Sequence, residues 1–116
     1  MATKLNERAY QHAQTLIAER RCVLDARDDW SEHRPSAQAE DRFIEEHGWD
    51  AYQDWYLAVD DEHGEDTKAR YKFPYGDFEN VHRCGVISAE SRAGQYRQPD
   101  VEEAARHLLR MLDELR

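Results

Sequence analysis

Hydrophobic residues recur at helical spacing near both ends of the chain. Near the start, Asn6 is a suitable N-cap, and one apolar stripe follows it, which predicts a first helix. The stripe consists of Ala9, Ala13, Leu16 and Ile17. Near the end, Asp100 and Glu103 resemble a capping box, and residues 101–115 carry the clearest amphipathic pattern of the chain. The sequence therefore predicts an amphipathic helix at each end.

The middle of the chain predicts three further segments. Ser36 is a good N-cap for a helix that Gly48 should end, and Asp50 caps a third helix over residues 51–59, where aromatic rings occur on nearly every side. Asp77 caps a fourth helix over roughly residues 78–95, whose buried face is small. Residues 29–36 read as a loop because a proline follows Arg34.

The aromatic segment 71–78 is the least regular part of this pattern. Pro74 argues against a regular central strand, so we expect an irregular segment or a short β element. The predicted fold class is mainly α. It is a compact single-domain bundle of four to five helices that spans residues 1–116, with the aromatic segment packed across the helices.

Composition is consistent with one folded domain. The chain has 116 residues and a mass of 13.7 kDa, and its twelve Trp, Tyr and Phe residues argue against disorder. It contains no apolar run of membrane-spanning length and no signal-type N-terminus, which predicts a cytoplasmic protein without membrane contact. The two cysteines lie outside any C-x-x-C pair and are expected to be free thiols.

Negative charge is concentrated in the centre of the chain. Residues 25–66 carry fifteen acidic and three basic side chains, a net charge of −12, whereas the whole chain has −9. This charge argues against direct nucleic-acid binding. It favours a noncatalytic protein-interaction module, with a protein partner or a homodimer, and less strongly a DNA mimic. The candidate partner surface is Asp60, Asp61, Glu62, Glu65 and Asp66.

Residues 67–97 form the positive and aromatic stretch beside this acidic block, with six basic and three acidic side chains. The alternative function is therefore a small-ligand or anion-binding protein, with or without enzymatic activity. The candidate ligand-binding residues are Lys72, Tyr75, Asp77, His82, Arg83 and Arg92. The same cations also have a purely structural interpretation, in which they pair with the acidic segment.

Catalytic and metal-binding patterns are weak. Glu79 and His82 have the E-x-x-H spacing of di-iron bundles, but such a site needs two copies and the chain has one. His82 and Cys84 lie two apart in the predicted fourth helix, so their side chains would diverge and form neither a zinc site nor a nucleophile–base pair. We predict no catalytic residue, no metal and no cofactor, and the sequence leans against an enzyme.

Two resemblances rest on the aromatic stretch. The motifs Y-K-F-P-Y-G-D-F (71–78), V-H-R (81–83) and A-E-S-R-A-G-Q (89–95) resemble a family of small bacterial cytosolic proteins without known activity, over residues 30–115. A fainter similarity, through Trp49, Tyr52, Tyr71–Pro74 and Arg83 with Gly85, is to a segment that accompanies head-maturation proteins of tailed phages. The second resemblance implies a two-stranded element around residues 71–75.

Overall fold

The computed structural model describes residues 3–115 and is mainly helical, as predicted. The α-helices are α1 (Glu7–Ala18), α2 (Trp30–His33), α3 (Ala37–Gln53), α4 (Arg83–Gln95) and α5 (Pro99–Asp113). The strands are β1 (Thr3–Leu5), β2 (Cys22–Val23), β3 (Tyr56–Asp60), β4 (Tyr71–Pro74) and β5 (Val81–His82). Two short 3₁₀ turns, Arg27–Asp29 and Lys68–Arg70, precede α2 and β4. No helix in this part of the chain has the length and apolar character needed to cross a membrane.

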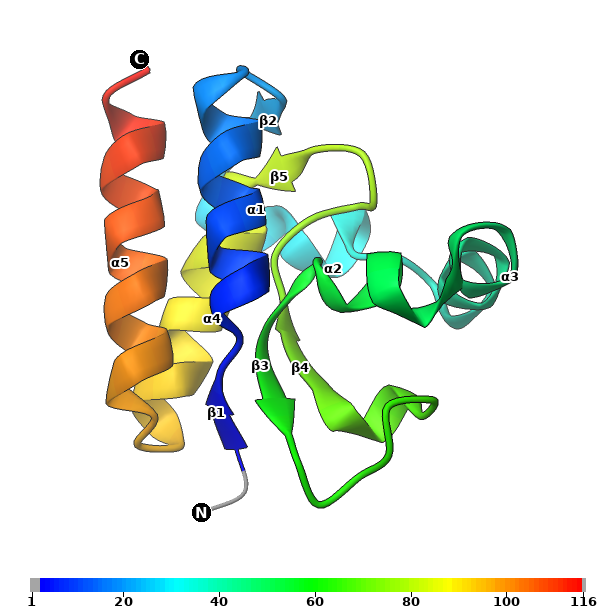
Figure 1. The fold of residues 1–116 in the computed structure, drawn as a ribbon. Helices are drawn as coiled ribbons and strands as arrows, with labels where there is room; N and C mark the ends of the chain where they lie inside the picture. Colours follow the sequence, from blue (N-terminus) through cyan, green and yellow to red (C-terminus); the bar gives the residue numbers. More distant parts are fainter. Residues whose placement is uncertain (1–2, 116) are drawn as a thin grey trace.

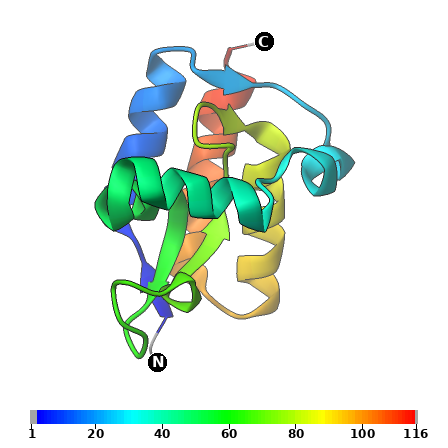
Figure 2. The ribbon, with the colours of Figure 1, turned by 90° about the vertical axis from the view of Figure 1, so that its right-hand side faces the viewer.

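A three-stranded antiparallel sheet lies between two helical layers. Strand β3 is central, with Val59 opposite Lys4 of β1 and Ala58 opposite Lys72 of β4. Helices α1, α4 and α5 cover one side of the sheet, and α3 crosses the other side (Figures 1 and 2). A separate parallel pair, β2 with β5, places Val23 opposite His82.

The core forms where these layers meet. The α1 stripe of alanine, leucine and isoleucine is buried as predicted, and so are five positions of α5. In α4, Gly85 permits a close approach, because a Cβ atom there would lie 2.8 Å from the carbonyl oxygen of Tyr75 and 2.9 Å from the Trp30 ring. The small buried face predicted for this helix thus brings α2 and the end of β4 against its first turn.

The predicted third helix is wrong beyond Gln53. At Gly48 the backbone leaves helical geometry, with a φ of +83° and a ψ of 171°, so the helix breaks where the sequence predicted its end. A second helical stretch continues to Gln53, and residues 56–60 then form β3. The first four residues of this strand are all buried, because helices cover both faces of the sheet. The sequence of such a strand is a continuous apolar run. It lacks the alternation of apolar and polar residues that distinguishes a strand from a buried helix.

The predicted fourth helix begins five residues later than expected. Asp77 caps a turn, where its Oδ1 accepts the backbone N–H groups of Glu79 at 3.0 Å and Asn80 at 2.8 Å. The chain then forms β5 before α4 starts at Arg83. The short β element allowed at 71–78 exists as β4, and Pro74 ends it on an edge strand, where a missing N–H is tolerated.

Two local predictions at the helix ends also need correction. Residues 30–33, expected in a loop, form α2. Gln98 is the N-cap residue of α5, without a side-chain capping bond, and the Asp100 carboxylate instead accepts the N–H of Leu5 at 2.9 Å. The N-caps predicted at Asn6 and Ser36 are confirmed, since each side chain accepts the N–H three residues later.

Candidate functional site

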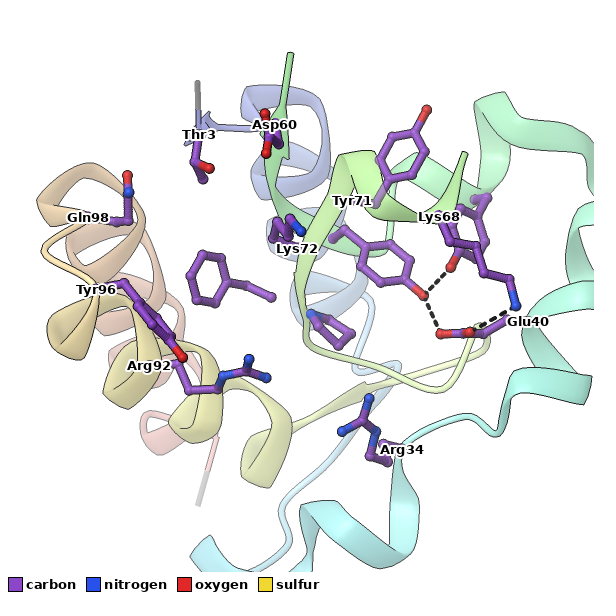
Figure 3. A pocket seen from close by; sticks show the side chains of 14 residues that line it. Thr3, Arg34, Glu40, Asp60, Lys68, Tyr71, Lys72, Arg92, Tyr96 and Gln98 are labelled. Atoms are coloured by element: carbon purple, nitrogen blue, oxygen red, sulfur yellow. Dashed lines mark hydrogen bonds and ion pairs between the residues drawn. The ribbon is translucent and has the colours of Figure 1, made fainter. Parts of the chain in front are cut away.

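A groove of about 590 Å³ opens beside β4 (Figure 3). Lys72, Phe73 and Pro74 of β4 line it. Arg92 and Tyr96, at the end of α4, line one side, and the opposite side is formed by Glu40 of α3 together with Lys68. Arg34, which directly follows α2, closes another edge, so the groove is assembled from segments far apart in the sequence.

Three cations of the groove lack an acidic partner. Lys68 forms ion pairs with Glu40 at 3.3 Å and Asp41 at 2.8 Å, and these contacts neutralise its charge. Arg34, Lys72 and Arg92 make no ion pair with any residue between 3 and 115. The groove also contains Asp60, whose Oδ2 lies 3.8 Å from His63 Nε2. The side near Arg34 and Arg92 therefore offers positive charge to a ligand.

Aromatic side chains supply the apolar part of the groove. Tyr96 is 60% exposed, the largest exposed fraction among the big hydrophobic side chains of residues 3–115. Phe73 is buried and has a φ of +61°, a left-handed backbone conformation that costs about 1–3 kcal/mol for a non-glycine residue. Deeper in the groove, the Tyr56 hydroxyl lies 2.8 Å from that of Tyr52 and donates to Glu40 at 2.9 Å. Burial raises the pKa of Tyr52 to about 12, so these hydroxyls stay neutral.

A second polar site lies where β5 meets α4. Asp25 follows β2, and its Oδ2 is 2.7 Å from His82 Nδ1 and 2.8 Å from His33 Nδ1. Its Oδ1 accepts the N–H of Cys84 at 2.8 Å. On the other side of the imidazole, Asp77 Oδ2 is 2.8 Å from His82 Nε2. We call these five residues the Asp25–His82 cluster.

Hydrogen bonds set the charges in the Asp25–His82 cluster. Burial acts to raise the pKa of Asp25, but the Cys84 N–H and the His82 side chain outweigh it and lower that pKa to about 2. Burial acts to lower the pKa of His82, but its hydrogen bonds to Asp77 and Asp25 dominate and raise it. Burial, followed by the Asp25 carboxylate, raises the pKa of the Cys84 thiol to about 12. The resting thiol is therefore protonated and unreactive.

Four of the six candidate ligand-binding residues lie in these two places. Lys72 and Arg92 lie together in the groove, and Asp77 and His82 lie together in the cluster. Arg83 belongs to neither, because its Nε donates to Asp113 of α5 at 2.9 Å. Tyr75 is fully buried, and its hydroxyl donates to the carbonyl oxygen of Asp54 at 2.6 Å.

The candidate partner surface begins at Asp60, the last residue of β3, and continues into the connection between β3 and β4. Asp60 accepts the N–H of Glu62 at 3.0 Å, and Asp61 lies 3.8 Å from Lys4. The side chains of Glu62, Glu65 and Asp66 are exposed and make no ion pair within the described residues 3–115. The acidic connection is thus an open surface loop next to the groove, which Asp60 also lines.

Sequence reasoning missed Arg34, Tyr96, Asp25 and His33. Arg34 lies in the segment that the sequence predicts as a loop, and only the packing of α2 against α4 brings it near Arg92. Asp25 and His82 are 57 residues apart and meet through the parallel pairing of β2 with β5. A two-residue parallel pair leaves no periodic pattern, so no sequence signal identified this contact.

No protein-family model, curated protein or solved structure matches this chain. The two resemblances stated for the aromatic stretch stay predictions. The function of this chain must therefore be argued from the geometry of its own residues.

Proposed function

We propose that this protein binds a small aromatic anion in the groove beside β4. Arg34, Lys72 and Arg92 supply the charge, and Tyr96 and Phe73 supply an apolar surface for a ring. The observation that carries the proposal is the convergence of three cations without partners in a chain of net charge −9. With 25 carboxylates in the chain, cations that stay unpaired in one groove are not needed for solubility or for closing the fold.

The ligand class follows from the two kinds of lining. Guanidinium groups bind carboxylate, phosphate or sulfonate through directed hydrogen bonds, and a ring can stack on Tyr96 while its acidic group reaches Arg92 or Arg34. Pockets of this size typically hold a small molecule, with a few polar groups that fix its orientation. Arg34, Arg92 and Tyr96 are exposed to water, so we expect affinity to fall as salt concentration rises.

A fluorescent aromatic anion, 8-anilinonaphthalene-1-sulfonate, tests this site directly. The double variant Lys72→Glu/Arg92→Glu should bind it at least about tenfold more weakly, because each lost charge-assisted hydrogen bond is worth about 1.5–3 kcal/mol. The matched control is Arg42→Glu/Arg110→Glu, which changes net charge equally at exposed positions outside the groove. Its affinity should stay within about twofold of the wild type.

Near-UV circular dichroism accompanies each titration, because the probe also binds partially folded states. Equal binding by the native-like groove variant and the wild type would reject the site. Equal loss in both double variants would show that only total charge matters and would reject it too.

A second candidate function is supported by the β3–β4 connection. Its exposed carboxylates at Glu62, Glu65 and Asp66 suit a basic protein partner, as the charge pattern of the sequence predicts. Reversing all three to lysine should remove such a partner from a pull-down made in the protein's own host. Reversal of the exposed Glu45, Glu103 and Glu114 is the control and should leave the partner bound. A partner retained by the first triple variant would contradict this function.

A further inference from the structure

We propose that Asp25, His33, His82 and Cys84 bind one divalent transition-metal ion, best matched by Zn²⁺. Their four ligand atoms, one oxygen, two nitrogens and one sulfur, all lie within 4.8 Å of one another. The ion would join Asp25, which follows β2, and His33, the last residue of α2, to His82 of β5 and Cys84 in the first turn of α4. This site is separate from the groove, and the two proposals can fail independently.

The geometry is close to that of a bound ion. A tetrahedral zinc centre with bonds of about 2.0–2.3 Å places its ligand atoms roughly 3.3–3.8 Å apart. Cys84 Sγ already lies 3.7 Å from His33 Nδ1. The two imidazole nitrogens lie 2.7 and 2.8 Å from Asp25 Oδ2, so each pair must separate by less than about 1 Å to admit the ion.

The ligand types favour zinc over the hard cations. Thiolate and imidazole are borderline or soft ligands that suit Zn²⁺, whereas Ca²⁺ and Mg²⁺ select oxygen ligands. Four protein ligands leave no open position for a substrate, which is typical of a structural centre. A structural ion also suits the location, because the segment from residue 24 to residue 35 buries only one large apolar side chain, Trp30.

A second, independent observation is the contact behind His82. Its Nε2 faces Asp77 Oδ2 at 2.8 Å, and Asp77 is itself held by the N–H groups of Glu79 and Asn80. A carboxylate on the far nitrogen of a ligand histidine is the usual outer contact of zinc sites, where it fixes the orientation of the ring. The Cys84 N–H similarly holds Asp25 Oδ1, which leaves Oδ2 facing the two histidines.

A nucleophilic function for the same residues does not fit this geometry. In a catalytic triad, the acid and the nucleophile contact different nitrogens of the histidine. Here Asp25 Oδ2 and Cys84 Sγ both lie against Nδ1 of His33. Cys84 is also fully buried, so no substrate reaches its sulfur. In the predicted fourth helix the side chains of His82 and Cys84 would diverge, but His82 lies in β5, and both residues contact Asp25.

The net charge of the site does not change when the ion binds. Both nitrogens of His82 face carboxylates, so both donate and the ring is an imidazolium in the metal-free protein. On binding, His82 Nδ1 and Cys84 Sγ each release one proton to solvent, and His33 moves its proton from Nδ1 to Nε2. The two released protons balance the charge of the divalent ion. The His33 side chain is 35% exposed and provides the path by which the ion enters.

The test uses the full chain after treatment with a chelator, followed by titration with Zn²⁺ or Co²⁺. We expect one ion per chain by elemental analysis and a thiolate-to-cobalt charge-transfer band with Co²⁺. At a free Zn²⁺ concentration of about 100 times the dissociation constant, the melting temperature should rise by roughly 10 °C. A natively folded wild-type chain that retains no stoichiometric metal would overturn the proposal.

Cysteine variants locate the ion. Cys84→Ser should lose the cobalt band and bind Zn²⁺ at least about tenfold more weakly, whereas Cys22→Ser, the other free cysteine, should match the wild type. If Cys84→Ser does not fold, His33→Ala serves instead, because its side chain is partly exposed; it should also weaken Zn²⁺ binding at least about tenfold. Loss of the band in Cys22→Ser, or unchanged binding in His33→Ala, would contradict the site.

Discussion

Replacing Asp25 with alanine is expected to lower the free energy of unfolding by about 3–5 kcal/mol, even with chelator present. The Asp25 side chain is only 7% exposed and contacts the N–H of Cys84 and both histidine Nδ1 atoms. Its removal leaves the His82 imidazolium buried with one carboxylate instead of two. The Cys84 N–H and the Nδ1 groups of His33 and His82 also lose their acceptor, and each buried donor left unsatisfied costs about 1–3 kcal/mol.

Chemical denaturation of the metal-free proteins measures this effect. Asp28→Ala is the matched control, because Asp28 lies in the same segment, is exposed, and its side chain makes no hydrogen bond or ion pair within residues 3–115. It should change the free energy of unfolding by no more than about 0.5 kcal/mol. A loss below about 1 kcal/mol for Asp25→Ala would show that the Asp25–His82 cluster does not hold the segment before α2 in place.

The second large effect is expected at Asn6. This residue is 7% exposed, and its side-chain nitrogen donates to the carbonyl oxygens of Gln53 at 2.9 Å and Tyr56 at 3.0 Å. Its side-chain oxygen accepts the N–H of Ala9 at the start of α1. Asn6→Ala therefore removes a helix cap and takes the donor away from the buried carbonyl group of Tyr56 and the partly buried carbonyl group of Gln53. The expected loss is about 2–4 kcal/mol of the free energy of unfolding.

Two further variants separate the contributions of Asn6. Ser36→Ala removes only an exposed N-cap, that of α3, and should cost about 1 kcal/mol. Asn6→Asp keeps the capping acceptor but turns a carboxylate oxygen toward the two carbonyl groups, so it should be nearly as destabilising as Asn6→Ala. A fully stable Asn6→Asp variant would show that Asn6 acts as a cap alone.

The sequence predicted the elements whose signals are local. The N-caps at Asn6 and Ser36 and the buried stripes of α1 and α5 follow from spacing and capping chemistry alone. Strand β3 could not be recognised, because burial on both faces removes its alternation. Asp77 was predicted to cap a helix, but it caps a turn. Both structures use the same hydrogen bond, from a backbone N–H to the aspartate side chain, so the sequence does not distinguish them.

The candidate site also combines residues that the sequence pattern identified with residues that it did not. Lys72 and Arg92 were identified because a basic and aromatic stretch is visible in the sequence, and the fold brings both into one groove. Arg34 and Asp25 belong to the acidic part of the chain, and their contribution depends on α2 and β2 packing near α4 and β5. The chemistry of a site built from separate segments becomes visible only when the tertiary contacts are known.

The central claim is that the groove beside β4 binds aromatic anions, and an NMR titration of the ¹⁵N-labelled full chain with 8-anilinonaphthalene-1-sulfonate tests it most directly. We predict saturable amide shifts concentrated in residues 68–74 and 92–98, which line or border the groove. The pocket between α1 and α5, near Tyr10 and His107, should stay unchanged. Shifts centred on that second pocket, or spread evenly over the chain, would contradict the claim.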